Sequence, residues 1–303
     1  MSTIVSASMR GASSVKVTVI RRQIGRSVRR TIVRTPTVFG ELFTPPDRGP
    51  HPGIVVLGGS EGGYPTDLPA MLASHGFAAL SIAYFGEPDQ PKDLVGVPIE
   101  TVRAAAEYLV RQHSANVGGV GVLGVSRGGE LALLAAAHFR SIRAVVAIVP
   151  SPIVEAGLRF GTGPVDASAW TYAGNPVPFA TFPQIERFLQ IGDEVQIAPS
   201  LIQLGNINGP VEIVTAGDDQ LGFSGALFTQ FLKQHPLRSG DGHVNYAAAG
   251  HLIDIPYTPT ANLSELRTPY GVLHFGGNPQ AYAVADADSW PRILSFLHKS
   301  LSH

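Results

Sequence analysis

From about residue 53 onward, short runs of β-branched and apolar residues alternate with Ala- and Leu-rich segments of helical spacing. Mostly apolar runs of this kind are typical of parallel strands buried on both faces, and the segments between them of covering helices. Strands are predicted at 54–57, 77–83, 120–125, 144–149 and 211–215, and helices at 68–74, 99–112, 129–139 and 286–301. The pattern predicts an α/β fold with a mostly parallel central sheet and helices on both faces.

Two stretches depart from this rhythm, and we expect both to belong to one domain spanning residues 1–303. Within residues 1–50, the alternation at 15–20 and 31–43 predicts antiparallel strands that extend one edge of the sheet. Residues 151–209 contain scattered prolines and glycines, which predict an irregular insertion. Its aromatic residues favour a lid that lines a substrate pocket over a passive surface excursion; they are Phe160, Trp170, Tyr172, Phe179 and Phe182.

Composition narrows the partners and the chemistry. The formal net charge is −1, so no strong field would attract nucleic acid or an anionic membrane, and we expect a small-molecule partner. The chain contains no cysteine, which excludes disulfides, thiolate metal sites and a cysteine nucleophile. No secretory signal and no apolar run of membrane-spanning length is apparent, so a cytoplasmic location is expected. No metal-binding or cofactor motif is apparent, and none is expected to be needed.

The most informative segment is Gly124–Gly128, which reads Gly-Val-Ser-Arg-Gly between a predicted strand and a predicted helix. This strand, turn and helix context defines the nucleophile elbow of α/β-hydrolases, in which the central serine is exposed at the carboxyl edge of the sheet. The serine lies at a helix N-terminus, where free amides favour the negative charge that develops on an attacked carbonyl oxygen. Ser126 is therefore the predicted nucleophile of an acyl-enzyme.

A glycine-rich loop, residues 58–63, follows the strand predicted at 54–57. In this fold such a loop supplies one backbone amide of the oxyanion hole, and the residue after the nucleophile supplies the other. The candidates are the amides of Gly59 or Ser60, together with that of Arg127. Phosphate binding is the alternative, but the loop lacks both the Gly-Lys-Ser/Thr ending and the dinucleotide-binding glycine spacing.

The acid and the base are expected in the order serine, acid, histidine along the chain. The strand predicted at 211–215 leads into Asp218 and Asp219, either of which could orient a histidine, and we favour Asp219. Among the ten histidines, His251 follows a run of small residues and is the predicted general base. His243 is a weaker rival, since it also follows the aspartate pair.

Four segments together resemble one family, the acyl-CoA thioesterases and bile acid-CoA:amino acid N-acyltransferases. The segments are 124–132, 217–220, 250–257 and 276–283. The similarity to the catalytic domain of that family runs from about Pro52 to Leu301. It implies an α/β-hydrolase fold, with Ser126 as nucleophile, Asp219 as acid and His251 as base, in agreement with the choices made from the residues.

This chain departs from the pattern of the family in two respects. Better-known members carry an additional N-terminal β-sandwich domain, for which the residues before His51 are too few. The aminoacyl-transferring members use a cysteine nucleophile, whereas this chain has serine at the matching position, which favours hydrolysis by water over transfer to an amine.

Three functions remain open from the sequence. The resemblance favours an acyl-CoA thioesterase, but the motifs fit equally a dienelactone-hydrolase-like carboxylesterase that acts on an oxygen ester or lactone. A binding protein on an inactive hydrolase scaffold is the non-enzymatic alternative, and it would usually lack one of the three catalytic residues. If CoA is the leaving group, a few local cations should bind its phosphates, and Arg127 and Arg159 are the nearest to the motifs.

Overall fold

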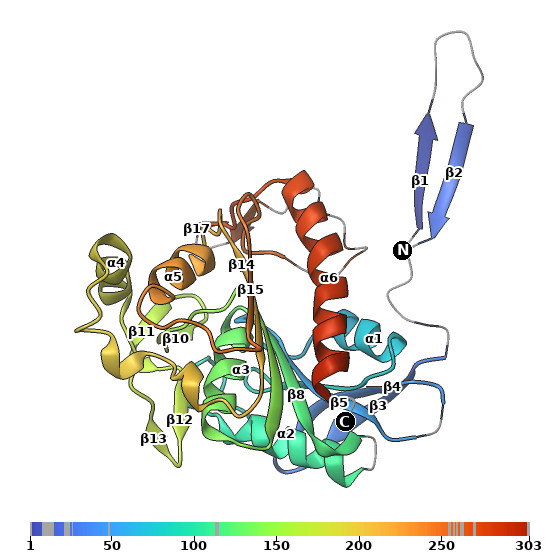
Figure 1. Cartoon of the computed structure of the whole chain (residues 1–303), viewed down its shortest axis with the longest axis horizontal. Helices are drawn as coiled ribbons and strands as arrows, with labels where there is room; N and C mark the ends of the chain where they lie inside the picture. The colour runs from blue at the N-terminus through green and yellow to red at the C-terminus, as the bar shows by residue number, and fades with distance from the viewer. Residues whose placement is uncertain are drawn as a thin grey trace.

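The computed structural model describes residues 2–7, 15–20, 25, 27–47, 49–112, 115–253, 256, 258, 260, 264–268 and 271–301. Within them, the central sheet has eight strands (Figure 1). In spatial order these are β15 (Gly242–Tyr246), β14 (Val211–Ala216), β9 (Ile142–Ile148), β8 (Ala115–Val125), β5 (His51–Leu57), β6 (Ala78–Ala83), β4 (Phe39–Thr44) and β3 (Arg29–Arg34). The strands from β15 to β6 are parallel, while β4 and β3 extend the edge in antiparallel pairing.

Helices cover both faces of this sheet, which confirms the predicted architecture (Figure 1). Helices α1 (Asp67–Ser74) and α6 (Pro279–Leu301) pack with the apolar side chains of one face. Helices α2 (Glu100–Arg111), α3 (Arg127–His138) and α5 (Ser224–Phe231) pack on the other. Every residue of β6 and β14 is buried, because both faces of these central strands are covered.

The prediction for the first edge strand is wrong in its partner. Strand β2 (Val15–Ile20) does not extend the central sheet but pairs with β1 (Ser2–Ala7) in a separate antiparallel hairpin (Figure 1). Alternation of apolar and polar residues predicts a strand, but it does not specify which strand that one pairs with. The predicted strand at 31–43 is in fact two, β3 and β4, joined by a turn.

The insertion between β9 and β14 contains more regular structure than its prolines predict. Strands β10 (Ala156–Arg159) and β11 (Gly163–Ser168) form a hairpin, and α4 (Phe182–Ile191) follows. Strand β12 (Trp170–Tyr172) lies between the short strands β13 (Asn175–Pro176) and β7 (Val97–Pro98). Trp170 is fully buried, so the insertion is anchored to the core.

The last part of the chain forms a short hairpin of β16 (Glu265–Thr268) and β17 (Gly271–His274), followed by α6. Three residues of the family motif at 250–257, namely Asp254, Ile255 and Tyr257, lie outside the described residues. In the part of the chain that the structure describes, no helix has the length and apolarity needed to cross a bilayer.

Candidate active site

Ser126 occupies a tight turn between β8 and α3, in the backbone conformation φ 55°, ψ −120°. A left-handed φ is strained for a residue with a side chain and is typical of functional turns. The two flanking glycines explain how the turn closes. A Cβ atom on Gly124 would overlap the carbonyl oxygen of Gly128, and one on Gly128 would overlap that of Gly58. The glycines therefore let strand, helix and neighbouring loop approach closely, as the motif predicts.

The structure brings the three predicted side chains into one hydrogen-bonded chain. The Nε2 atom of His251 lies 2.8 Å from the Oγ atom of Ser126. On the other side of the ring, Nδ1 lies 2.9 and 3.0 Å from the two carboxylate oxygens of Asp219. His251 and Asp219 are both buried, whereas Ser126 is half-buried at the turn. This geometry allows the imidazole to accept the serine proton while Asp219 fixes the tautomer.

Asp219 is held as a carboxylate by donors from its own loop. Oδ1 accepts hydrogen bonds from the backbone amides of Leu221 and Gly222, and Oδ2 accepts from both the amide and the hydroxyl of Ser224. Burial alone would raise the pKa of this carboxyl. The interaction with His251 and the hydrogen bonds from Ser224 and Gly222 outweigh that effect and hold its pKa below the usual value.

Asp218 has no hydrogen bond with the histidine among the described residues and stabilises a neighbouring turn instead. Its Oδ2 atom accepts a hydrogen bond of 2.8 Å from the amide of Gly277. Gly276 and Gly277 have φ values of 71° and 68°, in the left-handed region that favours glycine. The family motif at 276–283 thus packs against the aspartate loop.

The same motif, together with the residue just before it, supports the histidine loop. The amide of His251 donates to the carbonyl of Phe275, at 2.8 Å. The hydroxyl of Tyr282 donates to the carbonyl of Gly276 at 3.0 Å and accepts from the amide of Leu252 at 3.4 Å. The two loops and the start of α6 therefore form one interlocked unit around His251.

His243, the weaker rival for the base, lies within β15, paired with Ile213 of β14. Its Nε2 atom is 2.8 Å from the hydroxyl of Thr215, and burial lowers its pKa. The structure places it in the sheet and does not bring it to Ser126.

The candidate oxyanion-hole amides differ in their partners. Arg127 is the first residue of α3, so its amide has no acceptor within the helix. The amide of Gly59 donates to the Oε1 atom of Glu61, at 2.9 Å. Within the described residues, the amide of Ser60 has no acceptor. Sequence reasoning did not foresee the contact of Glu61.

Comparison with known proteins identifies the family. Residues 97–303 match the model of the BAAT / acyl-CoA thioester hydrolase C-terminal family. The rat acyl-coenzyme A amino acid N-acyltransferase 2 is 32% identical over 91% of this chain and 67% of its own length. The chain belongs to this family. Mouse mitochondrial acyl-coenzyme A thioesterase 2 is 30% identical over 93% of the chain and 62% of its own length, so the chain spans about two thirds of such relatives.

Solved structures support the fold of this family member. A dienelactone hydrolase-like promiscuous phosphotriesterase from metagenomic libraries superposes with a TM-score of 0.55 at 18% identity, over 90% of this chain and 99% of that one. A puromycin-hydrolysing peptidase of Mycobacterium tuberculosis gives 0.57 at 13% identity, over 99% of this chain and 46% of its own. The fold is that of the α/β-hydrolases, as the elbow motif predicts.

The side chain of Arg127 is enclosed beneath the elbow. Its Nη1 atom lies 2.8 Å from Glu130 Oε2 and 2.9 Å from Glu155 Oε2, and only 7% of its side chain is exposed. Trp170 donates to the second oxygen of Glu130, at 2.6 Å. The expectation that Arg127 binds a phosphate is therefore wrong, because its buried guanidinium is already paired with Glu155 of the insertion and with Glu130 in the first turn of its own helix.

Two acids share one arginine in this cluster, and Glu130 is fully buried. Burial raises the pKa of Glu130 to about 8, and the nearby carboxylate of Glu155 adds to the shift against the effect of Arg127. The cluster ties the first turn of α3 to the insertion.

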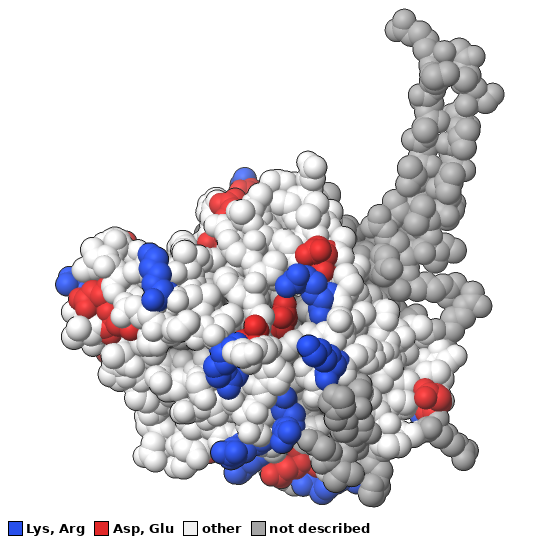
Figure 2. Space-filling view, viewed as in Figure 1, with Lys and Arg blue, Asp and Glu red and all other residues white. Residues whose placement is uncertain are grey.

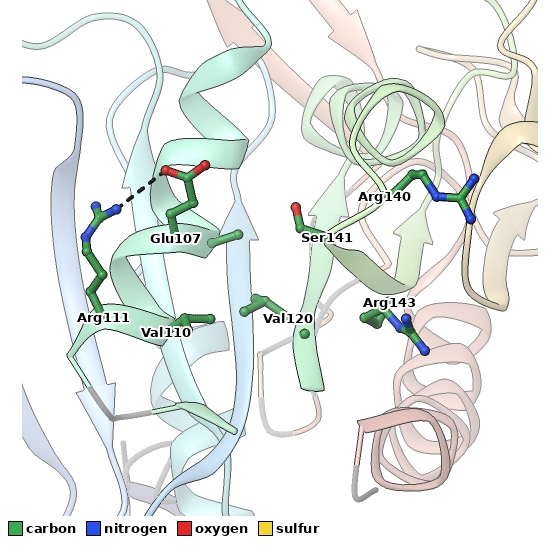
Figure 3. A pocket seen from close by; sticks show the side chains of 9 residues that line it. Glu107, Val110, Arg111, Val120, Arg140, Ser141 and Arg143 are labelled. Atoms are coloured by element: carbon green, nitrogen blue, oxygen red, sulfur yellow. Dashed lines mark hydrogen bonds and ion pairs between the residues drawn. The ribbon is translucent and has the colours of Figure 1, made fainter. Parts of the chain in front are cut away.

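A cavity of about 360 Å³ lies at the opposite end of β8, between α2 and the start of β9 (Figure 3). Arg111, which lines it, pairs with Glu107 at 3.5 Å, while Arg140 and Arg143 point away from that pair in Figure 3. The elbow follows the other end of β8, so this cavity is separate from the candidate active site. Across the described chain, no three His, Asp or Glu side chains gather so as to hold a metal ion.

Proposed function

We propose that this protein hydrolyses the thioester of an acyl-CoA through an acyl-enzyme on Ser126. The observation that carries the proposal is the hydrogen-bonded chain from Ser126 through His251 to Asp219, in a member of this family. The names of its relatives, acyl-CoA thioesterases and acyl-CoA N-acyltransferases, have the acyl-CoA substrate in common.

The chemistry follows from the positions of the three side chains. His251 Nε2 accepts the proton of Ser126 as its Oγ atom attacks the thioester carbon, and Asp219 stabilises the resulting imidazolium. The amide of Arg127, with that of Gly59 or Ser60, stabilises the oxyanion. Collapse of the intermediate breaks the carbon–sulfur bond, and the imidazolium protonates the leaving sulfur. A water molecule, deprotonated by His251, then releases the acid and restores Ser126.

We propose water rather than an amine as the acceptor of the acyl group. The resemblance implies a cysteine nucleophile in the aminoacyl-transferring members, and this chain has serine there and no cysteine anywhere. The proposal for this step is therefore hydrolysis.

The insertion at 151–209 is proposed to contact the acyl group through Phe182, at the start of α4. This ring is 55% exposed and lies 6.4 Å from that of Phe223, which follows the loop of Asp219. Phe223 has a φ of 52°, a strained conformation for an aromatic residue beside the catalytic loop. Trp170 has a structural place instead, since it is buried against Glu130.

Hydrolysis of an oxygen ester is the second candidate, and the charges near the elbow favour it. The guanidinium of Arg127 is paired with two glutamates, and that of Arg159 is paired with Asp93 at 3.6 Å. On the face shown in Figure 2, acidic and basic side chains are interspersed rather than separated. A substrate without phosphates would need no cationic site.

A panel of acyl-CoAs and matched p-nitrophenyl esters separates the two candidates. A thioesterase should prefer the acyl-CoA by more than the intrinsic reactivities explain, and its kcat/KM should fall as salt rises. Good activity on oxygen esters without hydrolysis of any acyl-CoA would overturn the thioester proposal and leave Ser126 as the nucleophile of an esterase.

A further inference from the structure

The glycine-rich loop after β5 lies directly against the nucleophile. A Cβ atom on Gly59 would lie 3.4 Å from that of Ser126, and one on Gly128 of the elbow would overlap the carbonyl oxygen of Gly58. Any shift of this loop therefore changes the distance between its amides and the reacting carbonyl group.

Two side chains fix the loop, one by donating to its carbonyl oxygens and the other by accepting from one of its amides. The buried hydroxyl of Tyr84 lies 2.7 Å from the carbonyl oxygens of both Gly58 and Gly59. The carboxylate of Glu61 accepts the amide of Gly59 at 2.9 Å. A Cβ atom on Gly58 or Gly59 would lie 2.7 Å from a carboxylate oxygen of Glu61, so a larger residue at either position would displace this side chain.

The amide of Gly59 is thus engaged, while that of Ser60, in the described part of the chain, has no acceptor. We infer that Glu61 is a positioning residue that fixes the glycine-rich loop, so that the amides of Ser60 and Arg127 are the two oxyanion donors. The inference rests on the proposed function and narrows its choice between Gly59 and Ser60.

To fix the loop, residue 61 needs a hydrogen-bond acceptor for the Gly59 amide and does not need a negative charge. A carboxylate bound to the Gly59 amide prevents the peptide from rotating, and a carboxamide oxygen can do the same. A negative charge near the oxyanion would by itself oppose the reaction. Glu61 should therefore help catalysis through the hydrogen bond and in spite of its charge.

The test uses Glu61→Ala and Glu61→Gln in the full chain, with a short p-nitrophenyl ester as substrate and phenylboronic acid as transition-state analogue. Glu61 is exposed, so both variants should fold. The matched control is Glu87→Ala, which removes a carboxylate 3.7 Å from the position of a Cβ on Gly63 in the same loop. Among the described residues, Glu87 accepts no hydrogen bond from that loop.

Glu61→Ala should lower kcat by about 10- to 100-fold with KM little changed, since a displaced oxyanion donor costs on this scale. The inhibition constant of phenylboronic acid should rise by a similar factor, an effect that partial unfolding would not produce. The kcat of Glu61→Gln should stay within about threefold of the wild-type value, and the kcat of Glu87→Ala should equal the wild-type value.

Two results would overturn the inference. Unchanged kcat in Glu61→Ala would show that the contact has no role in catalysis. Tighter binding of phenylboronic acid to that variant would mean that Glu61 competes for the amide of Gly59, which would then be the donor. Failure of the proposed function is distinguishable, since the wild-type protein would then hydrolyse no ester and show no labelling of Ser126 by a fluorophosphonate.

Discussion

Replacing Asp219 or Asp218 by asparagine separates two adjacent carboxylates that the sequence alone does not distinguish. The oxygens of Asp219 accept four hydrogen bonds from residues 221–224 in addition to that of His251. An asparagine offers one oxygen and one NH2 group, so one of the two acceptor positions becomes a donor. The NH2 group would face either backbone amides or the imidazole, and neither arrangement satisfies all partners.

The magnitude follows from the tautomer. With the NH2 group toward His251, Nδ1 must accept, the proton moves to Nε2, and the ring cannot accept the proton of Ser126. This loss is on the order of 10³- to 10⁴-fold in kcat. In Asp218→Asn, the side-chain oxygen can still accept from Gly277. The weaker hydrogen bond costs about 1 kcal/mol, and activity should fall by less than about tenfold.

The assay is kcat and KM on one p-nitrophenyl ester at neutral pH, with circular dichroism to establish that both variants are folded. Equal losses in the two variants would refute the assignment of Asp219. A loss of less than tenfold in Asp219→Asn would also refute it, since the hydrogen bond to His251 Nδ1 would then have little part in catalysis.

Glu130, Phe182 and Tyr282 each have a contact whose loss should be measurable. Because the pKa of Glu130 is about 8 in the folded protein and about 4 in an unfolded chain, its protonation stabilises the fold at low pH, and this contribution declines as pH rises toward 8. The Tm of Glu130→Gln should therefore depend less on pH between 5 and 8 than that of wild type, and parallel curves would contradict the shift. Phe182→Ala should change the ratio of kcat/KM for dodecanoyl and butanoyl esters about fivefold. The control is Phe160→Ala, which truncates a ring that is 64% exposed. The same ratio in Phe182→Ala as in wild type would show that Phe182 does not contact the acyl group. Tyr282→Phe should lower kcat about five- to tenfold by loosening the histidine loop. The control is Tyr246→Phe, which removes a hydroxyl that donates to Asp288 elsewhere on α6 and should leave kcat unchanged. Equal effects of the two variants would refute the role of Tyr282 in supporting the histidine loop.

The parts of the fold that the sequence predicts are those with local signatures. Buried parallel strands appear as continuous apolar runs, so β5, β6, β8, β9 and β14 are recognisable. The elbow is predicted because the glycines on both sides of Ser126 satisfy a steric requirement within five residues. Strand β2 is recognisable as a strand, but its partner depends on competing pairings, and alternation carries no information on those.

The remaining features depend on contacts between distant segments. Arg127 is paired with Glu155, and Trp170 donates to Glu130 in the same cluster. No periodicity in the sequence links these positions. The sequence places both aspartates after β14, and only the turn of the backbone decides which one faces His251. The contact of Glu61 with Gly59 is local, but it depends on a side-chain conformation that has no pattern in the sequence.

The most direct test of the central claim is mass spectrometry of the protein quenched during turnover of an acyl-CoA or a p-nitrophenyl ester. We expect one acyl adduct, mapped to Ser126, which accumulates when deacylation is slow and is absent from Ser126→Ala. Ser126→Ala should also lose nearly all turnover while keeping its fold. An adduct on another residue, or turnover by Ser126→Ala at the wild-type rate, would contradict the claim that this serine is the nucleophile.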